Sequence, residues 1–176
     1  MLLNKLPCLD KGYVAYVDSS CNSTKLNTMA LGLFKKTDSR FLYDLGTLTI
    51  VMKCPLFVQL NLSQFDLKII NIPSSEVEAY VPNVGEVGCP DHNTAKAISD
   101  DIERTTAALL INPKAYQADG CERFASQVLT PISTYTTLIV HGSYNEWKKF
   151  SSQNGMPNGM ISYADAVQQI MQMEWK

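Results

Sequence analysis

Side chains suited to gripping phosphate or carboxylate groups are scarce in this chain of 176 residues. Only three of its fifteen basic residues are arginines, namely Arg40, Arg104 and Arg123. Arginine presents a planar fork of donors that binds an oxyanion through two hydrogen bonds, whereas lysine acts as a point charge. A site that binds phosphate through several guanidinium groups would therefore need nearly all of the arginines in this chain.

Histidine and cysteine, the usual ligands of transition metals, show no metal-binding spacing. The histidines are His92 and His141, and the five cysteines stand at positions 8, 21, 54, 89 and 121. This spacing contains neither a C-x-x-C redox motif nor a zinc-ribbon pattern. We therefore expect no metal site, and mostly buried, reduced thiols.

Charge and hydropathy exclude two further classes of partner. A net charge of −2 gives no general attraction for nucleic acid. No apolar run is long enough to be a signal peptide or to cross a bilayer. We expect a cytoplasmic protein that binds neither nucleic acid nor membrane.

The first half of the sequence is rich in strand signals. Residues 12–18, 29–34 and 47–53 alternate or cluster apolar side chains as strands do. In the third of these, Leu48, Ile50 and Met52 share one face. Pro55 ends that strand and suits the first turn of a helix over residues 56–64. Together these segments predict an antiparallel sheet.

The second half is dominated by helix signals. Residues 73–90 carry the proline and glycine content of a loop, with a short extended piece at 79–82. Helices are predicted from residue 93 to a break at Asn112-Pro113, then over 115–129, and from Pro131 to about 150. A last apolar stripe over 163–171 predicts one more helix. We expect a single α+β domain, 1–176, with the N-terminal sheet packed against the C-terminal helices.

Three blocks of sequence resemble the flavin-dependent thymidylate synthases. Residues 12–18 are similar to the family's opening strand, and residues 48–58 (L-T-I-V-M-K-C-P-L-F-V) to its strand-then-helix segment. Residues 122–136, with Gly142, Ser143, Trp147 and Phe150, resemble its E-x-A-R-x-V-L-P…Y-T and G-S-L-R-x-W-x-x-F segments. The resemblance implies the fold of that family.

The family methylates dUMP, with bound FAD reduced by NADPH and methylenetetrahydrofolate as the carbon donor. No protein nucleophile attacks the base, so the protein contributes binding, orientation and electrostatics. The resemblance therefore implies no catalytic residue of the nucleophilic kind, and FAD as the cofactor. It also implies phosphate groups that must be held by charge-assisted hydrogen bonds.

The arginines that the family uses for this purpose are absent from the aligned positions. The family's R-H-R triplet falls on Gln64, Phe65 and Asp66, and other family arginines fall on Ser126, Asn145 and Asn154. Each charged hydrogen bond lost costs on the order of 1.5–3 kcal/mol. A carboxylate such as Asp66 adds repulsion toward phosphate.

If a pocket remains, the resemblance still indicates which residues would line it. They are the cofactor-contacting Gln64, Gln127 and His141, and the substrate-contacting Glu76, Tyr80, Ser143 and Asn145. Each also has a plain alternative role in packing, capping or solvation. Tyr80, for example, is better suited to packing than to stacking on a ligand.

Two functions remain open at this point. One is a family descendant that kept the scaffold, lost FAD and catalysis, and binds a protein partner or ligand. The alternative is an active FAD-dependent pyrimidine nucleotide methyltransferase whose phosphate ligands have moved, for instance to Lys53, Lys68, Arg123, Lys148 or backbone amides. The family forms homotetramers, so the resemblance also implies a homo-oligomer.

Overall fold

The computed structural model describes residues 5–20, 46–74, 77–119, 130–152, 156 and 158–174. The chain divides into two compact units. The first comprises Met1–Cys54, Val58–Pro73 and Thr136–Lys176, and the second Pro55–Phe57 and Ser74–Tyr135. The strand predicted at 29–34 lies outside the described residues.

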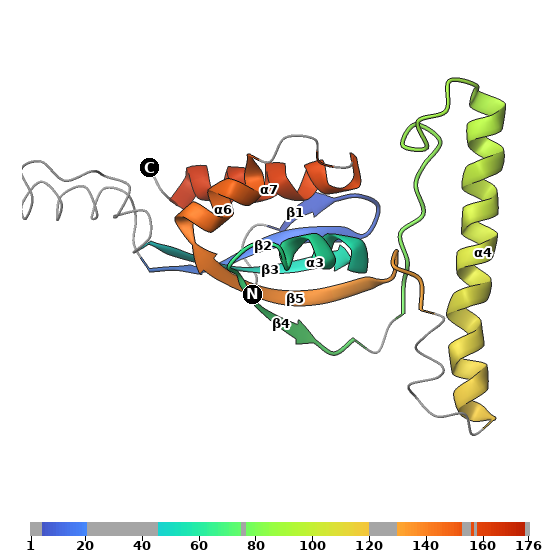
Figure 1. Cartoon of the computed structure of the whole chain (residues 1–176), viewed down its shortest axis with the longest axis horizontal. Helices are drawn as coiled ribbons and strands as arrows, with labels where there is room; N and C mark the ends of the chain where they lie inside the picture. The colour runs from blue at the N-terminus through green and yellow to red at the C-terminus, as the bar shows by residue number, and fades with distance from the viewer. Residues whose placement is uncertain are drawn as a thin grey trace, which may run out of the picture. The chain divides into compact units, whose positions relative to one another are not determined.

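The centre of the first unit is a five-stranded sheet with strand order β1-β2-β3-β5-β4 (Figure 1). Its strands are β1 (Lys5–Cys8), β2 (Gly12–Ser19), β3 (Thr47–Pro55), β4 (Lys68–Ile72) and β5 (Tyr135–Ser143). β1 pairs antiparallel with β2, β2 with β3, and β4 with β5. Hydrogen bonds from the Tyr144 amide to the Gly46 carbonyl and from the Leu56 amide to the Thr134 carbonyl show that β3 and β5 are also antiparallel.

The face of β3 predicted to be buried forms the core of this sheet. Leu48, Ile50 and Met52 are completely buried, whereas Thr47, Thr49 and Lys53 on the other face are half-buried. This difference confirms the predicted alternation. The helix expected after Pro55 is also present as α3 (Leu56–Leu62).

Two C-terminal helices, α6 (Tyr144–Ser151) and α7 (Asn158–Glu174), lie together along one side of the sheet (Figure 1). Trp147 and Tyr163 are completely buried. The Trp147 Nε1 donates to the Leu48 carbonyl at 3.0 Å, and the Tyr163 hydroxyl donates to the Lys53 carbonyl at 3.0 Å. These aromatic side chains therefore attach each helix to β3 through both packing and a buried hydrogen bond.

The helix predicted from Pro131 to about residue 150 is wrong over Tyr135–Ser143, which form strand β5, and is confirmed over residues 144–150, which belong to α6. Residues 136–140 read T-T-L-I-V, in which four of five side chains are β-branched and favour a strand. Burial alternates along β5, with Leu138 and Val140 completely buried. Strands β1 and β4 were not predicted either, because short edge strands carry too few residues for a clear alternation.

The second unit contains α4 (His92–Ala118) and the loop before it. The loop is as predicted, and its extended piece forms an isolated bridge between Ala79 and Thr134. The predicted break at Asn112-Pro113 is wrong, since α4 continues through Pro113 to Ala118. Proline removes only one backbone donor, and a helix of 27 residues retains its other hydrogen bonds. Beyond residue 119, the helix predicted over 115–129 lies outside the described residues.

The described cysteines behave as structural thiols. Cys8 and Cys54 are buried and Cys89 is half-buried, and all three are free. Burial raises the pKa of Cys8 to about 12, so this thiol stays protonated at neutral pH. The described residues contain no group of three histidine, cysteine or acidic side chains able to hold a metal ion. No helix in the described ranges is both long and apolar enough to cross a membrane.

Gly12 marks the tightest point of the sheet and provides a test of this packing. A Cβ atom there would lie 2.7 Å from the Cys8 carbonyl oxygen and 2.8 Å from that of Lys53, and would collide with the Tyr163 hydroxyl. We expect Gly12→Ala to lower the free energy of unfolding by about 1–3 kcal/mol, as overpacked core substitutions do. Urea denaturation measures this loss.

Gly85→Ala is the matched control for that substitution. Its Cβ would meet only the Asn83 Oδ1, at 3.4 Å, which is an ordinary contact. We expect a change of less than about 1 kcal/mol. Equal losses in the two variants would contradict the packing described around Gly12.

Candidate functional site

Two predicted site segments meet where β5 ends and α6 begins. The segment that contains Gln64 follows α3, and the Asp66 amide donates to the Glu146 Oε2 of α6 at 3.2 Å. Ser143 and Asn145 stand at the start of α6. The structure thus brings together residues about 80 positions apart in the sequence. We call the group formed by Asp66, Ser143, Glu146 and Lys149 the β5–α6 corner.

Ser143 has a structural role at this corner. It is the N-cap of α6, with extended backbone, and its Oγ accepts from the Glu146 amide at 3.3 Å. The next amide, that of Tyr144, donates to the Gly46 carbonyl at 2.8 Å. An N-cap hydroxyl satisfies a helix amide that would otherwise need water or a ligand. Two of the amides at this helix start are therefore already occupied.

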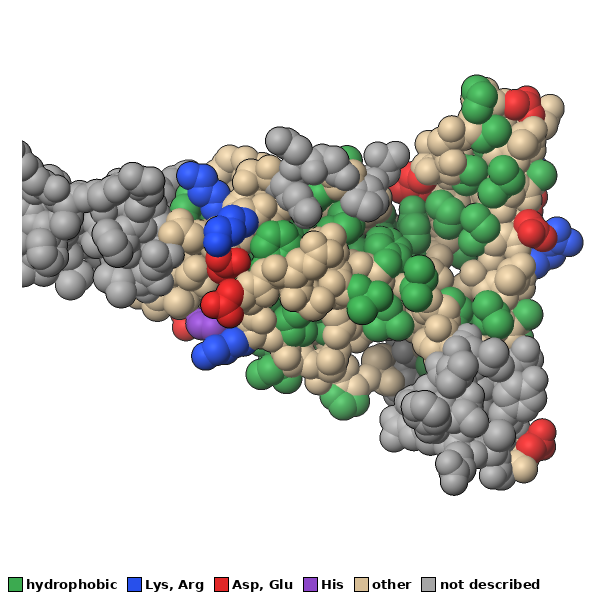
Figure 2. All heavy atoms as spheres, in the orientation of Figure 1, with side chains coloured by type: hydrophobic (Ala, Val, Ile, Leu, Met, Phe, Trp, Pro, Cys, Tyr) green, Lys and Arg blue, Asp and Glu red, His purple; other side chains and the backbone are tan. Residues whose placement is uncertain are grey.

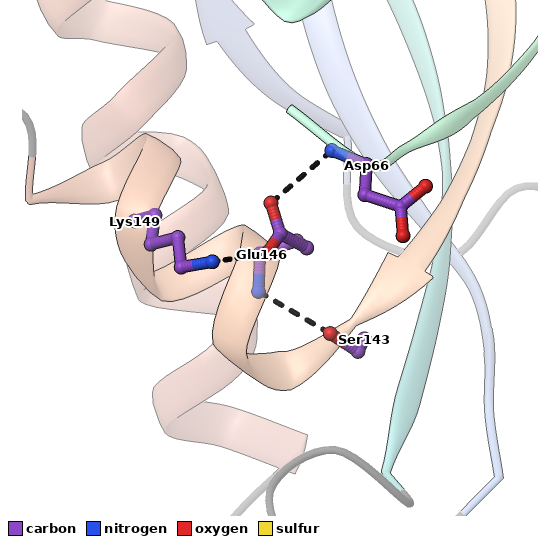
Figure 3. Close-up of polar contacts among 4 residues, drawn as sticks. All are labelled: Asp66, Ser143, Glu146 and Lys149. Atoms are coloured by element: carbon purple, nitrogen blue, oxygen red, sulfur yellow. Dashed lines mark hydrogen bonds and ion pairs between the residues drawn. The ribbon is translucent and has the colours of Figure 1, made fainter. Parts of the chain in front are cut away.

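The Glu146 carboxylate is the centre of the corner (Figure 3). One oxygen accepts from the Asp66 amide, and the other forms an ion pair with the Lys149 ammonium one helical turn away. The Glu146 side chain is only 15% exposed. The Asp66 carboxylate points away from this group in Figure 3. The Glu146 carboxylate thus accepts from the nearby backbone amide and pairs with the nearby ammonium group, so these donors are already occupied.

The electrostatic environment keeps Glu146 ionised. The hydrogen bond from Lys149 lowers the pKa of the Glu146 carboxyl below its ordinary value, partial burial opposes this, and the Asp66 amide lowers it further. The corner holds two acidic side chains, those of Asp66 and Glu146, and one basic side chain, that of Lys149. Figure 2 shows acidic and basic side chains intermixed at this end of the sheet, without a broad basic surface among the coloured side chains.

Aromatic packing fixes the segment after α3 against α6. The Phe65 ring lies 5.7 Å from the Phe150 ring at 90°, and Phe150 lies 6.1 Å from Trp147. Edge-to-face pairs of this kind stabilise an arrangement beyond their buried area. On β5, Gly142 leaves the space that the Leu67 side chain fills. The position of residues 64–67 is therefore set by packing.

His141 lies on strand β5, and the expectation that it belongs to a helix is wrong. Its Nδ1 is 2.9 Å from the Thr49 Oγ1. Its neighbour Gly142 faces Trp147, so His141 is directed to the opposite face of the sheet. Lys68 of β4 lies opposite His141 in the register of the two strands. His141 therefore does not join Glu146 at the corner.

Of the remaining predicted site residues, the structure describes Gln64 and Tyr80. Gln64 is exposed in the turn after α3, and its amide donates to the Asn61 carbonyl. Tyr80 belongs to the second unit, where its buried ring lies 6.1 Å from Phe57. Glu76 and Gln127 lie outside the described residues.

Among solved structures, the crystal structure of the UMP/dUMP methylase PolB from Streptomyces cacaoi, bound with 5-Br UMP, matches this chain. The match covers 97% of this chain and 93% of that chain, with a TM-score of 0.79 and 14% sequence identity. The chain has the fold of a UMP/dUMP methylase. This finding supports the flavin-dependent thymidylate synthase-like fold and confirms the predicted α+β class. No protein-family model and no curated protein sequence matches.

The described residues do not fit a phosphate-bearing flavin or nucleotide at the β5–α6 corner. The aligned positions hold Gln64, Asp66 and Asn145, none of which carries a positive charge. Lys149 is already paired with Glu146. Arg104, the arginine that lies in the described ranges, is on α4 and pairs with Asp101 at 3.2 Å.

Sequence reasoning identified Asp66 and the missing arginines but not the part that Glu146 and Lys149 play. Neither Glu146 nor Lys149 was among the predicted site residues. Their spacing of three residues on a helix is the signal that indicates a side-chain pair. The partner of Glu146 after α3 could not be found this way, because it is a backbone amide far away in the sequence.

Replacing Glu146 tests how the corner is held. In the folded state the pKa of Glu146 is lowered, so its stabilising effect is present above the ordinary value of 4.5 and is lost as the pH falls through the folded value. We expect Glu146→Gln to reduce the free energy of unfolding by about 1 kcal/mol at pH 7. As the pH falls below the lowered pKa of Glu146, the difference from the unmodified protein should shrink toward zero.

Glu103→Gln is the comparison for this experiment. Glu103 is an exposed carboxylate of α4, so we expect its replacement to change stability by less than about 0.5 kcal/mol at either pH. Urea titrations of the three proteins give the comparison. A loss in Glu146→Gln that is independent of pH would contradict the ionic role of Glu146.

Proposed function

We propose that this chain is a non-catalytic relative of the flavin-dependent thymidylate synthases that acts by binding a protein partner or a ligand. The scaffold is retained over nearly its whole length, since 97% of the chain matches the UMP/dUMP methylase. The residues that would hold phosphate groups are replaced. Retention of fold together with loss of site charge is the pattern expected when selection on chemistry ends and selection on shape continues.

The observation that carries this proposal is the position of the Glu146 carboxylate. This carboxylate accepts a hydrogen bond from the Asp66 amide and forms an ion pair with the Lys149 ammonium. A phosphate group bound at the same donors would have to displace a carboxylate that is nearly buried and ionised. The chain thus supplies its own anion at the corner.

Charge adds to this obstacle. A phosphate monoester bound at these donors would lie beside the Glu146 carboxylate, whose charge Lys149 already neutralises. Two unit charges 5–6 Å apart repel by about 3 kcal/mol at an effective dielectric constant of 20. A family site with arginines at the aligned positions would gain on the order of 1.5–3 kcal/mol from each charged hydrogen bond instead. The difference amounts to several decades in affinity.

The alternative is an active methyltransferase that holds its phosphates with other cations. The described lysines named for that role lie on three separate elements, since Lys53 is on β3, Lys68 on β4 and Lys148 on α6. Arg123 lies outside the described residues. Backbone amides are a poor substitute at the corner, because those of Asp66, Tyr144 and Glu146 already donate within the chain.

Absence of a bound flavin is the first test of the proposal. We expect the purified protein to be colourless and to release no flavin on denaturation, because its corner does not provide the charges that a dinucleotide requires. Absorbance between 350 and 500 nm before and after denaturation measures this. A stoichiometric flavin spectrum would sink the proposal.

Nucleotide binding gives an independent test. A ligand at 100 times its dissociation constant stabilises a protein by about 2.7 kcal/mol, which raises the melting temperature by roughly 5–10 °C at this chain length. We expect millimolar dUMP or UMP to shift it by less than about 1 °C. An active flavin-dependent thymidylate synthase is the positive control, and a comparable shift in both proteins would contradict the proposal.

A further inference from the structure

A groove between α6 and α7 lies apart from the β5–α6 corner. It has a volume of about 340 Å³ and is lined by Tyr144, Lys148, Ser151, Ser152, Gln168, Met171 and Gln172. Both helices belong to the first compact unit. The volume is at the lower end of the range of ligand sites, roughly 300–1,000 Å³, and suits a metabolite-sized molecule.

Helical spacing explains why these side chains share one groove. On α6, Tyr144, Lys148 and Ser151 follow one another at intervals of four and three residues, which places them on one helix face. Gln168 and Gln172 do the same on α7. Met171 is 5% exposed and forms an apolar floor. The groove therefore has polar side chains from both helices on its sides and the Met171 thioether at its base.

The groove is rich in donors, and none of its described lining residues is acidic. In the described part of the chain, the side chains of Lys148, Gln168 and Gln172 form no hydrogen bond or ion pair. The hydroxyls of Ser151 and Ser152 donate to the Lys148 carbonyl at 3.2 and 2.6 Å. These hydrogen bonds satisfy a carbonyl acceptor at the end of α6. One ammonium and two amide groups are left to face a ligand, and such a set suits an acceptor-rich anion.

We propose that the α6–α7 groove is a binding site for a small organic oxyanion, with a phosphate monoester or carboxylate head at Lys148, Gln168 and Gln172 and an apolar body on Met171. The site does not use Glu146, Asp66 or Lys149. The body that it takes is apolar, unlike the sugar and base of dUMP or UMP, so the site stands whether or not the protein binds those nucleotides. It gives the scaffold a ligand of defined chemistry on a surface distinct from the corner.

The test is an NMR titration of the full chain with phenyl phosphate and, separately, benzoate. We expect saturable shifts of the backbone amides of residues 148–152 and 168–172 with at least one of the two. If only phenyl phosphate binds, the head is a phosphate; if only benzoate binds, it is a carboxylate. Lys148→Gln should weaken binding at least about tenfold, as loss of a charged hydrogen bond does.

A matched pair of substitutions on α7 tests the location. Gln168→Glu places a carboxylate in the groove at constant side-chain size, and should also weaken binding by about tenfold or more. Gln169→Glu makes the same chemical change at the exposed neighbouring position, which does not line the groove, and should leave affinity within about twofold. Equal weakening by both variants, or no saturable binding of either anion to the unmodified protein, would overturn the proposal.

Discussion

The hydrogen bond and ion pair of the Glu146 carboxylate hold the β5–α6 corner together. This carboxylate joins the segment after α3 to the first turn of α6 by accepting from the Asp66 amide, and it pairs with Lys149 along the helix. A carboxylate of the chain therefore takes up donors that could otherwise hold the oxyanion of a ligand. A corner of this kind is complete without a bound anion, because its donors are already satisfied within the chain.

The rest of the first unit holds that corner in place. Trp147 is attached to β3 through the Leu48 carbonyl, and Phe150 packs on Phe65. Gly142 gives Leu67 the space to approach β5. Since these contacts involve completely buried aromatic side chains, they keep the scaffold shape whatever the charges at its surface do. Such separation of packing from chemistry explains how a chain at 14% identity keeps a UMP/dUMP methylase fold.

Much of the sheet could be predicted from the sequence, because β2 and β3 carry clear patterns. Leu48, Ile50 and Met52 share one face and alternate with Thr47, Thr49 and Lys53, with Val51 as the exception, and Pro55 marks the change from strand to helix. Strand β5 was misread as a helix because Pro131 suggested a helix start and outweighed the β-branched run 136–140. The missing arginines were visible in the sequence. The contact of Glu146 with the Asp66 amide was not, since it depends on tertiary structure rather than on local pattern.

The most direct measurement of the central claim is product formation. Purified protein is incubated with FAD, NADPH and methylenetetrahydrofolate, together with dUMP or UMP, and the methylated nucleotide is separated by chromatography. The account predicts no methylated product above the level of a reaction without protein. Repeated turnover of either nucleotide would contradict it, and would show that phosphate groups are held by residues other than those of the β5–α6 corner.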